Sequence, residues 1–246
     1  MKNINKILLV FLSLIICFFS VSCDSSEKTP DEHEYVEMQT DINVSTGKAS
    51  SIVERDGYSL TVIRLTVSID EKKEFSNTLN SMLDEWLREG MIECDRYVES
   101  RGEGEREYSV VNYATFNRNG LLSLRCALEC YEYGESISYT LKSAVYDIGR
   151  ESEISLSQMF KMGEVDLENM LTMNVYPAVS RLPDRHPVFI LNGSGKYSEY
   201  MEYYINEYGV CLYLSYDNID YYVGFVSFEI SFSGDPESFN YDLSVA

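Results

Sequence analysis

Three strand-like stretches joined by tight turns constrain the fold of this chain most strongly. The stretches cover residues 108–116, 121–133 and 137–147. Asn119-Gly120 closes the first pair, because these two residue types readily adopt the positive φ angles of a short hairpin turn. Tyr133-Gly134-Glu135-Ser136 closes the second pair. The pattern therefore predicts an antiparallel meander.

A hairpin and a long helix are predicted before the meander. Strand-like residues at 44–54 and 58–69 flank the turn signal Arg55-Asp56-Gly57. The second stretch alternates with one slip between Val62 and Leu65, which indicates a bulge. Ser68 and Glu71 have the spacing of a capping box. Apolar residues then recur at helical spacing, and they predict a helix that ends near Val98 and buries the single tryptophan, Trp86.

The C-terminal half alternates less regularly. It predicts a short helical turn at 154–160, a longer helix at 165–176, and strands around Tyr203, at 210–216 and at 225–232. The polar tail after Gly234 is expected to be loose. The order of elements predicts the α+β class, with antiparallel sheets that carry helices on one side. We expect two sub-domains, at 41–100 and 101–234, followed by a tail at 235–246.

The N-terminus predicts export and a lipid anchor. Lys2 and Lys6 precede an uncharged apolar run, Ile7 to Val21, that is too short to span a bilayer as a helix. The sequence Ser20-Val21-Ser22-Cys23 resembles a bacterial lipobox, with Ser20 in place of the usual leucine. We therefore predict a signal peptide at 1–22, lipidation of Cys23 and a location at the bacterial cell envelope, with the chain anchored outside the cytoplasm. An ordinary secretory signal is the alternative.

Charge and composition limit the partners of the exported chain. Residues 23–40 are polar and acidic, and they are expected to form a flexible tether. The chain has a net charge of −20, and removal of the signal would leave 18 basic and 40 acidic residues, a charge of about −22. Such a field repels nucleic acid and attracts cationic partners. Solubility alone is the simpler explanation of the charge.

The remaining cysteines suggest no metal or redox chemistry. Cys94, Cys126, Cys130 and Cys211 include no C-x-x-C pair. On one strand Cys126 and Cys130 would lie ~13 Å apart, too far for a disulfide. A disulfide from either residue to Cys211 and buried thiols remain equal alternatives.

Several segments, taken in order, carry a family resemblance. They are the strand–strand–helix unit that ends near Val98, the meander, the stretch from Gly149-Arg150 to Phe160, and a closing aromatic pattern from Tyr203 to Ile230. On these segments the chain resembles the RsiV-like pair of extracytoplasmic domains, domain of unknown function 4163 followed by domain of unknown function 3298. Relatives often carry a Gly-Gly-Ala-His turn in the second hairpin, where this chain has Tyr133-Gly134-Glu135-Ser136.

The resemblance implies a sensing or binding module, and in the RsiV branch it implies binding of the cationic protein lysozyme. Acidic charge suits such a partner, because it raises the encounter rate. Only Met1 to Lys6 precede the apolar run, so we expect no cytoplasmic domain that could hold a sigma factor. If the protein signals, it is expected to do so through another protein.

Candidate site residues cluster before Gly224. Tyrosines and acids share a loop-like connection there, and the binding candidates are Tyr216, Asp217, Asp220, Tyr221 and Tyr222. We expect no catalytic residue, metal or cofactor. His186 is most simply a loop residue.

Three functions follow from these observations. The leading hypothesis is a lipid-anchored, non-catalytic binding or sensing module for a cationic protein such as lysozyme. The second is a module that binds peptidoglycan or another glycan, and the third is an envelope glycoside or peptidoglycan hydrolase that uses Asp217, Asp220 or His186.

Overall fold

A computed structural model describes residues 44–55, 57–101, 107–132, 135–179, 196–199, 201–214, 227–231, 238–241 and 243. All of them belong to one unit, Met38–Ala246. The strands are β1 Val44–Arg55, β2 Tyr58–Ile69, β3 Glu107–Arg118, β4 Leu121–Glu132, β5 Glu135–Asp147, β6 Ser152–Glu153, β7 Met201–Ile205, β8 Gly209–Leu214 and β9 Ser227–Ser231. The helices are α2 Lys73–Arg101, α3 Leu156–Met159 and α4 Glu164–Val179, with a 3-10 turn, η1, at Tyr197–Glu199.

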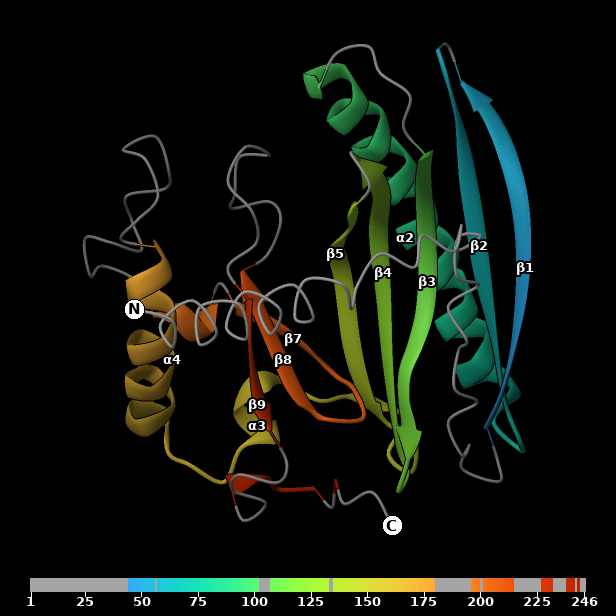
Figure 1. Ribbon diagram of the computed structural model, residues 1–246. Coiled ribbons are helices and arrows are strands. Elements are labelled where there is room, and N and C mark those ends of the chain that lie inside the picture. Colours follow the sequence, from blue (N-terminus) through green and yellow to red (C-terminus); the bar gives the residue numbers. More distant parts are fainter. Residues whose placement is uncertain are drawn as a thin grey trace, which may run out of the picture. The chain divides into compact units, whose positions relative to one another are not determined.

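The strands form two sheets, which confirms the α+β class. The large sheet has the order β1-β2-β3-β4-β5-β6, and β7-β8-β9 form the small sheet (Figure 1). The predicted hairpins are present in the large sheet. Gly57 turns from β1 into β2 with a φ of 91°, and Asn119 and Gly120 turn from β3 into β4 with φ values of 53° and 76°.

One pair of strands departs from the antiparallel expectation. β2 and β3 run parallel, and they pair only from Leu60 to Ile63 and from Tyr108 to Val111. A parallel pair needs a crossover connection, and α2 supplies it. The sub-domain boundary expected at residue 101 therefore falls between two neighbouring strands of one sheet.

The break in alternation between Val62 and Leu65 marks the point where β2 separates from β3, and it is not a bulge against β1. The register of β1 with β2 is continuous along their whole length. Beyond Ile63, β2 leaves β3, and α2 takes over its edge. The Val67 main chain donates to Asn80 Oδ1 and accepts from Asn80 Nδ2, both at 2.8 Å, and Ile69 N donates to Ser76 Oγ at 2.9 Å. Side chains of α2 thus replace the missing strand.

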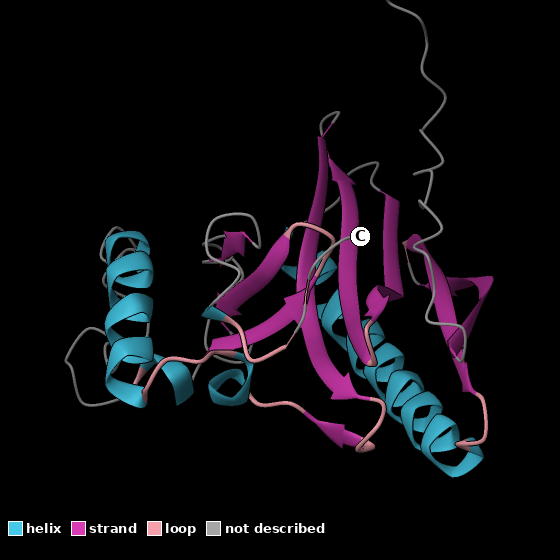
Figure 2. Cartoon of the chain, turned by 90° about the horizontal axis from the view of Figure 1, so that it is seen from below, coloured by secondary structure: helices cyan, strands magenta, loops and turns pink. Residues whose placement is uncertain are grey.

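The helix α2 packs against β2, β3 and β4 on one face of the large sheet (Figure 2). Its first half buries Phe75, Leu79 and Leu83, and its second half buries Leu87, Cys94 and Tyr97. Trp86 lies between the two clusters and is half-buried, so its predicted core position is confirmed in part.

The predicted capping box at the start of α2 is wrong. Ser68 lies in β2, and Glu71 turns with a φ of 62° before the helix begins at Lys73. The actual capping box is at Ser155 and Gln158, at the start of α3, where both reciprocal hydrogen bonds are present. The S-x-x-E spacing at Ser68 misled because β2 continues through this serine.

A third cluster holds the small sheet, α3 and α4 together. It joins Phe116, Leu121 and Val145 of the large sheet to residues of β7 and β8. Two serine hydroxyls satisfy the edge of β7: Ile205 N donates to Ser123 Oγ at 2.9 Å, and Ser143 Oγ donates to Tyr203 O at 2.7 Å.

The tail is not loose where the structure describes it. Phe239 and Leu243 are buried in the third cluster, and Phe239 forms a β-bridge with Phe160. Asn240 Nδ2 donates to Gln158 O and Phe160 O at 2.9 and 2.8 Å. Phe239 and Leu243 are apolar residues in a polar stretch, and their positions could have predicted this docking where overall composition could not.

Within the described part of the chain, no helix is both long enough and apolar enough to cross a membrane.

Close packing of α2 on the sheet depends on Gly90. A Cβ atom at this position would lie 2.6 Å from Val110 Cγ1 and 3.3 Å from Leu141 Cδ1. We expect Gly90→Ala to lower the free energy of unfolding by about 1–2 kcal/mol, because overpacking outweighs the better helix propensity of alanine.

Gly47→Ala, on the exposed side of β1, is the control, because nothing lies within 4 Å of a Cβ atom there. Denaturant unfolding followed by circular dichroism measures both variants. An equal or greater stability of Gly90→Ala would contradict the tight packing of α2.

Candidate functional site

The residues proposed as a site from the sequence lie outside the described residues. This holds for Tyr216, Asp217, Asp220, Tyr221 and Tyr222, and also for Cys23 and His186. The binding role of the tyrosines and aspartates and the lipidation of Cys23 therefore stay predictions. The described residues instead offer three polar features: a set of buried thiols, a cluster around Arg125, and a groove between α2 and β5.

The thiols are structural. Cys94, Cys126 and Cys130 lie in the cluster between α2 and the sheet, Cys211 lies on β8, and no disulfide joins any pair of them. The alternative of buried thiols therefore holds. Burial raises the pKa of Cys94, Cys126 and Cys211 to about 12 each. A nucleophilic or redox-active cysteine needs a lowered pKa, so these three thiols are poor nucleophiles.

The cluster around Arg125 lies on the face of the large sheet opposite α2. Arg125 follows Leu124 and precedes Cys126, which both pack on the α2 side. Its guanidinium carbon is 5.9 Å from the ring centroid of Tyr113 and 5.1 Å from that of Tyr204. Cation–π contacts at these distances hold the side chain between the two rings.

One donor of this guanidinium has no hydrogen-bond acceptor. Arg125 Nη2 donates to Ser138 Oγ at 2.7 Å, whereas Nε is buried and has no acceptor. No carboxylate of the described residues forms an ion pair with Arg125. Lys48 Nζ lies 5.6 Å from the Tyr113 centroid; burial lowers its pKa, and Glu129 opposes that shift.

The cluster combines polar groups of both signs, because the Tyr113 hydroxyl also donates to Glu129 Oε1 at 2.5 Å. It presents two cations and two tyrosines on one surface, and burial raises the pKa of Tyr204 to about 12, so this hydroxyl stays protonated. The described residues contain no group of His, Cys, Asp and Glu that could hold a metal ion. Arg125 was not proposed from the sequence, although a charged residue inside the apolar run Leu121-Leu-Ser-Leu-Arg is a usable signal.

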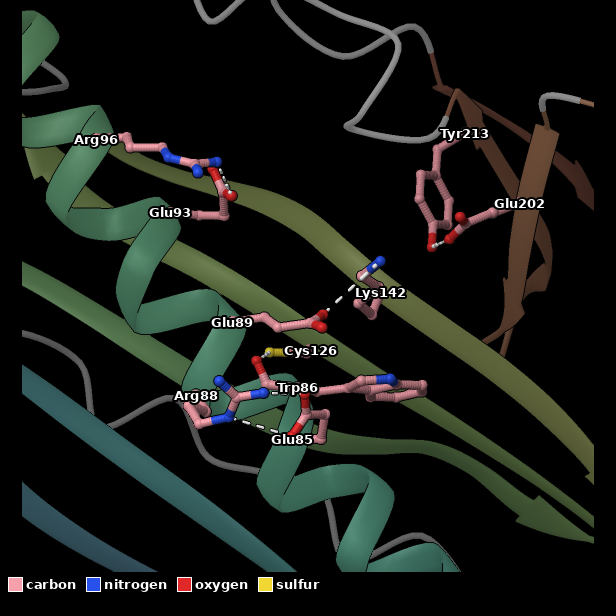
Figure 3. A network of polar contacts seen from close by, with 10 residues as sticks. All are labelled: Glu85, Trp86, Arg88, Glu89, Glu93, Arg96, Cys126, Lys142, Glu202 and Tyr213. Atoms are coloured by element: carbon pink, nitrogen blue, oxygen red, sulfur yellow. Dashed lines mark hydrogen bonds and ion pairs between the residues drawn. The ribbon is translucent and has the colours of Figure 1, made fainter.

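The groove between α2 and β5 is the third feature. It has a volume of about 290 Å³ and is lined by Trp86, Glu89, Gly90, Ile92, Glu93, Arg96, Leu141 and Lys142. Figure 3 shows Glu89 of α2 and Lys142 of β5 pointing toward each other, with Lys142 Nζ 3.8 Å from Glu89 Oε2.

Charged and apolar groups alternate around this groove. Further along the helix, Arg96 Nη1 lies 2.6 Å from Glu93 Oε1. Ile92 is 43% exposed, so an apolar side chain sits among these charges. Strand and helix residues distant in sequence line the groove, and sequence spacing therefore could not reveal it.

Comparisons with known proteins give a partial likeness in structure. No protein-family model matches the chain, and no curated protein matches it. A DUF3298 family member from Bacteroides fragilis has a TM-score of 0.44 and 13% identity over 81% of this chain and 94% of its own. A DUF3298 family protein from Pseudomonas aeruginosa has a TM-score of 0.45 and 12% identity over 82% and 97%. Both belong to the family named second in the sequence resemblance.

The raised thiol pKa values predict slow alkylation of the native protein. The shift from 9.0 to about 12 lowers the thiolate fraction of Cys94, Cys126 and Cys211 by roughly 1,000-fold at pH 8. We expect iodoacetamide to label these residues at least about 100-fold more slowly than in the unfolded chain. Peptide mass spectrometry with and without denaturant measures the ratio.

The same rise in thiol pKa makes the free energy of unfolding depend on pH. Because the pKa of each thiol is higher in the folded than in the unfolded chain, the contribution of these thiols to the free energy of unfolding is fully present below pH 9. It is lost as the pH rises toward about 12.

Rapid labelling of the folded protein at pH 8 would contradict the burial of these thiols.

Proposed function

We propose that the chain is a lipid-anchored, non-catalytic binding or sensing module of the bacterial cell envelope that binds a cationic protein such as lysozyme. The net charge of −20 carries this proposal. A strongly acidic protein attracts a basic partner over a distance and accelerates its encounter. The anchor at Cys23 and the extracytoplasmic location are part of the proposal and rest on the sequence.

The described surface supports the charge argument. α2 presents acids on its exposed side, among them Glu74, Asp84, Glu85 and Glu99. Arg64 and Arg88 bridge Asp84 and Glu85 respectively, but acids outnumber bases along the helix. The groove beside Lys142 adds a concave surface on the same helix.

Binding of lysozyme is the first test of this function. Calorimetric titration of the full chain, held in mild detergent, is expected to show saturable binding. The dissociation constant should rise at least about 10-fold between low salt and ~0.5 M salt, because screening removes the long-range attraction. An acidic protein of similar size is the control, and it should not bind.

Absence of saturable binding to lysozyme, or binding that salt does not weaken, would contradict a cationic protein partner. The salt dependence separates this outcome from nonspecific apolar adsorption, which added salt does not weaken.

A glycan is the second candidate ligand, and the Arg125 cluster is the observation that favours it. Tyr113, Tyr204 and Arg125 group aromatic rings, hydroxyls and a cation on one face. If peptidoglycan is bound there, the full chain should be retained on isolated cell wall, and Arg125→Gln should reduce the retained fraction several-fold.

The control for that experiment is Arg88→Gln, an exposed arginine of α2 that lies outside the cluster. Circular dichroism checks that both variants are folded. Equal retention of the two variants would exclude the Arg125 cluster as the glycan site.

A further inference from the structure

The large sheet ends in an edge that few described residues cover. β6 is the described strand next to β5, and it pairs only with Tyr146 and Asp147. The Val145 carbonyl accepts from Ile154 N at 2.8 Å, so pairing extends slightly further toward the middle of β5. From there toward Glu135 no described strand pairs with the outer edge of β5. The N–H and C=O groups of an edge strand are a template for another strand.

The groove lies directly beside this edge. α2 packs mainly on β2, β3 and β4, and it also reaches β5, where Tyr146 contacts Phe75 and donates to Met82 Sδ. A register shift at Cys126/Ala127 leaves Leu141 as the extra residue of β5. As a result, two consecutive residues of β5 line the groove on the α2 side: Leu141 packs in the core under the helix, and Lys142 reaches Glu89.

A helix and a strand edge with a groove between them can hold an extended peptide. The main chain of the peptide continues the sheet, and alternate side chains enter the groove. The groove volume of about 290 Å³ is at the lower end of small-molecule sites, which suits one or two side chains better than a whole ligand. Trp86 and Leu141 supply apolar side chains to the lining, and Glu89 and Glu93 line the helix side.

We propose that an extended segment of a basic partner protein adds as a strand to the outer edge of β5 and places an apolar side chain between Trp86 and Leu141. The inference rests on the proposed function for the class of partner, because the acidic charge of the chain selects a basic one. Among the residues that the structure describes, the ion pair of Glu89 is a long one, 3.8 Å to Lys142. A basic side chain of the incoming strand competes readily for this carboxylate.

The groove has its own spectroscopic reporter. Trp86 is the single tryptophan of the chain. The probe is the tryptophan-free peptide acetyl-Thr-Lys-Thr-Leu-Thr-Lys-Thr-amide, which is basic and which as a strand carries Leu and both Lys side chains on the same face. Titration of the full chain with this peptide is expected to change the Trp86 emission in a saturable way.

Two further peptides test the main-chain pairing. One is N-methylated at the odd positions and the other at the even positions. Only alternate N–H groups of a strand point at its neighbour, so one methylated peptide should bind at least about 10-fold more weakly and the other nearly as well as the parent. Equal binding of both would show charge attraction without strand addition and would overturn the inference.

Two variants of α2 test the position of the bound strand. Glu89→Lys changes a residue that lines the groove, and Glu85→Lys makes the same change in charge outside it. We expect the first to weaken peptide binding about 10-fold and the second less than about 2-fold. Equal effects would overturn the inference, and so would the absence of a saturable change in emission.

Competition separates this inference from the proposed function. Lysozyme that binds the chain but is not displaced by saturating peptide would leave the proposed function standing and overturn the strand addition at β5. Displacement would support both. A dimer in light scattering that the peptide dissociates would show that a second copy occupies the edge, and it would overturn the assignment to a basic partner.

Discussion

The fold depends on a short parallel ladder between β2 and β3. Four residues on each strand, Leu60–Ile63 and Tyr108–Val111, connect the β1–β2 hairpin to the rest of the large sheet. Beyond this ladder, Asn80 and Ser76 of α2 bind the main chain that β3 no longer reaches. The helix therefore acts as both crossover and substitute strand. The close approach at Gly90 fixes how near the helix lies to the sheet, and the groove lies between α2 and β5.

The face of the large sheet opposite α2 contacts the small sheet. An edge strand, β7, lies against this face, and buried main-chain groups at this contact need hydrogen-bond partners. Ser123 and Ser143 supply hydroxyls to Ile205 and Tyr203. Tyr213 on β8 then reaches Ser143 and Glu202, at 2.7 and 2.6 Å. Small polar residues within apolar strands thus mark the junction of the two sheets, and Arg125, on the same strand as Ser123, borders it.

Local patterns predicted the local structure well. The turn at Asn119-Gly120 and the period of α2 required only neighbouring residues, and both are confirmed. The parallel pairing of β2 with β3 could not be predicted in this way, because it depends on where α2 returns the chain. The docking of Phe239 on Phe160 is a long-range contact of the same kind. For the site, the groove joins Glu89 to Lys142 and the cluster joins Arg125 to Tyr204, and no motif spacing links such pairs.

The docked tail also makes the third cluster depend on contacts distant in sequence. The two clusters under α2 draw on residues from Val44 to Ile148, whereas the third cluster needs Phe239 and Leu243. A chain that emerges from its N-terminal end can complete the large sheet and α2 first. The small sheet lacks part of its core until the last segment arrives, and contacts this distant in sequence form slowly. Loss of this segment would therefore expose the part of the third cluster that Phe239 and Leu243 cover.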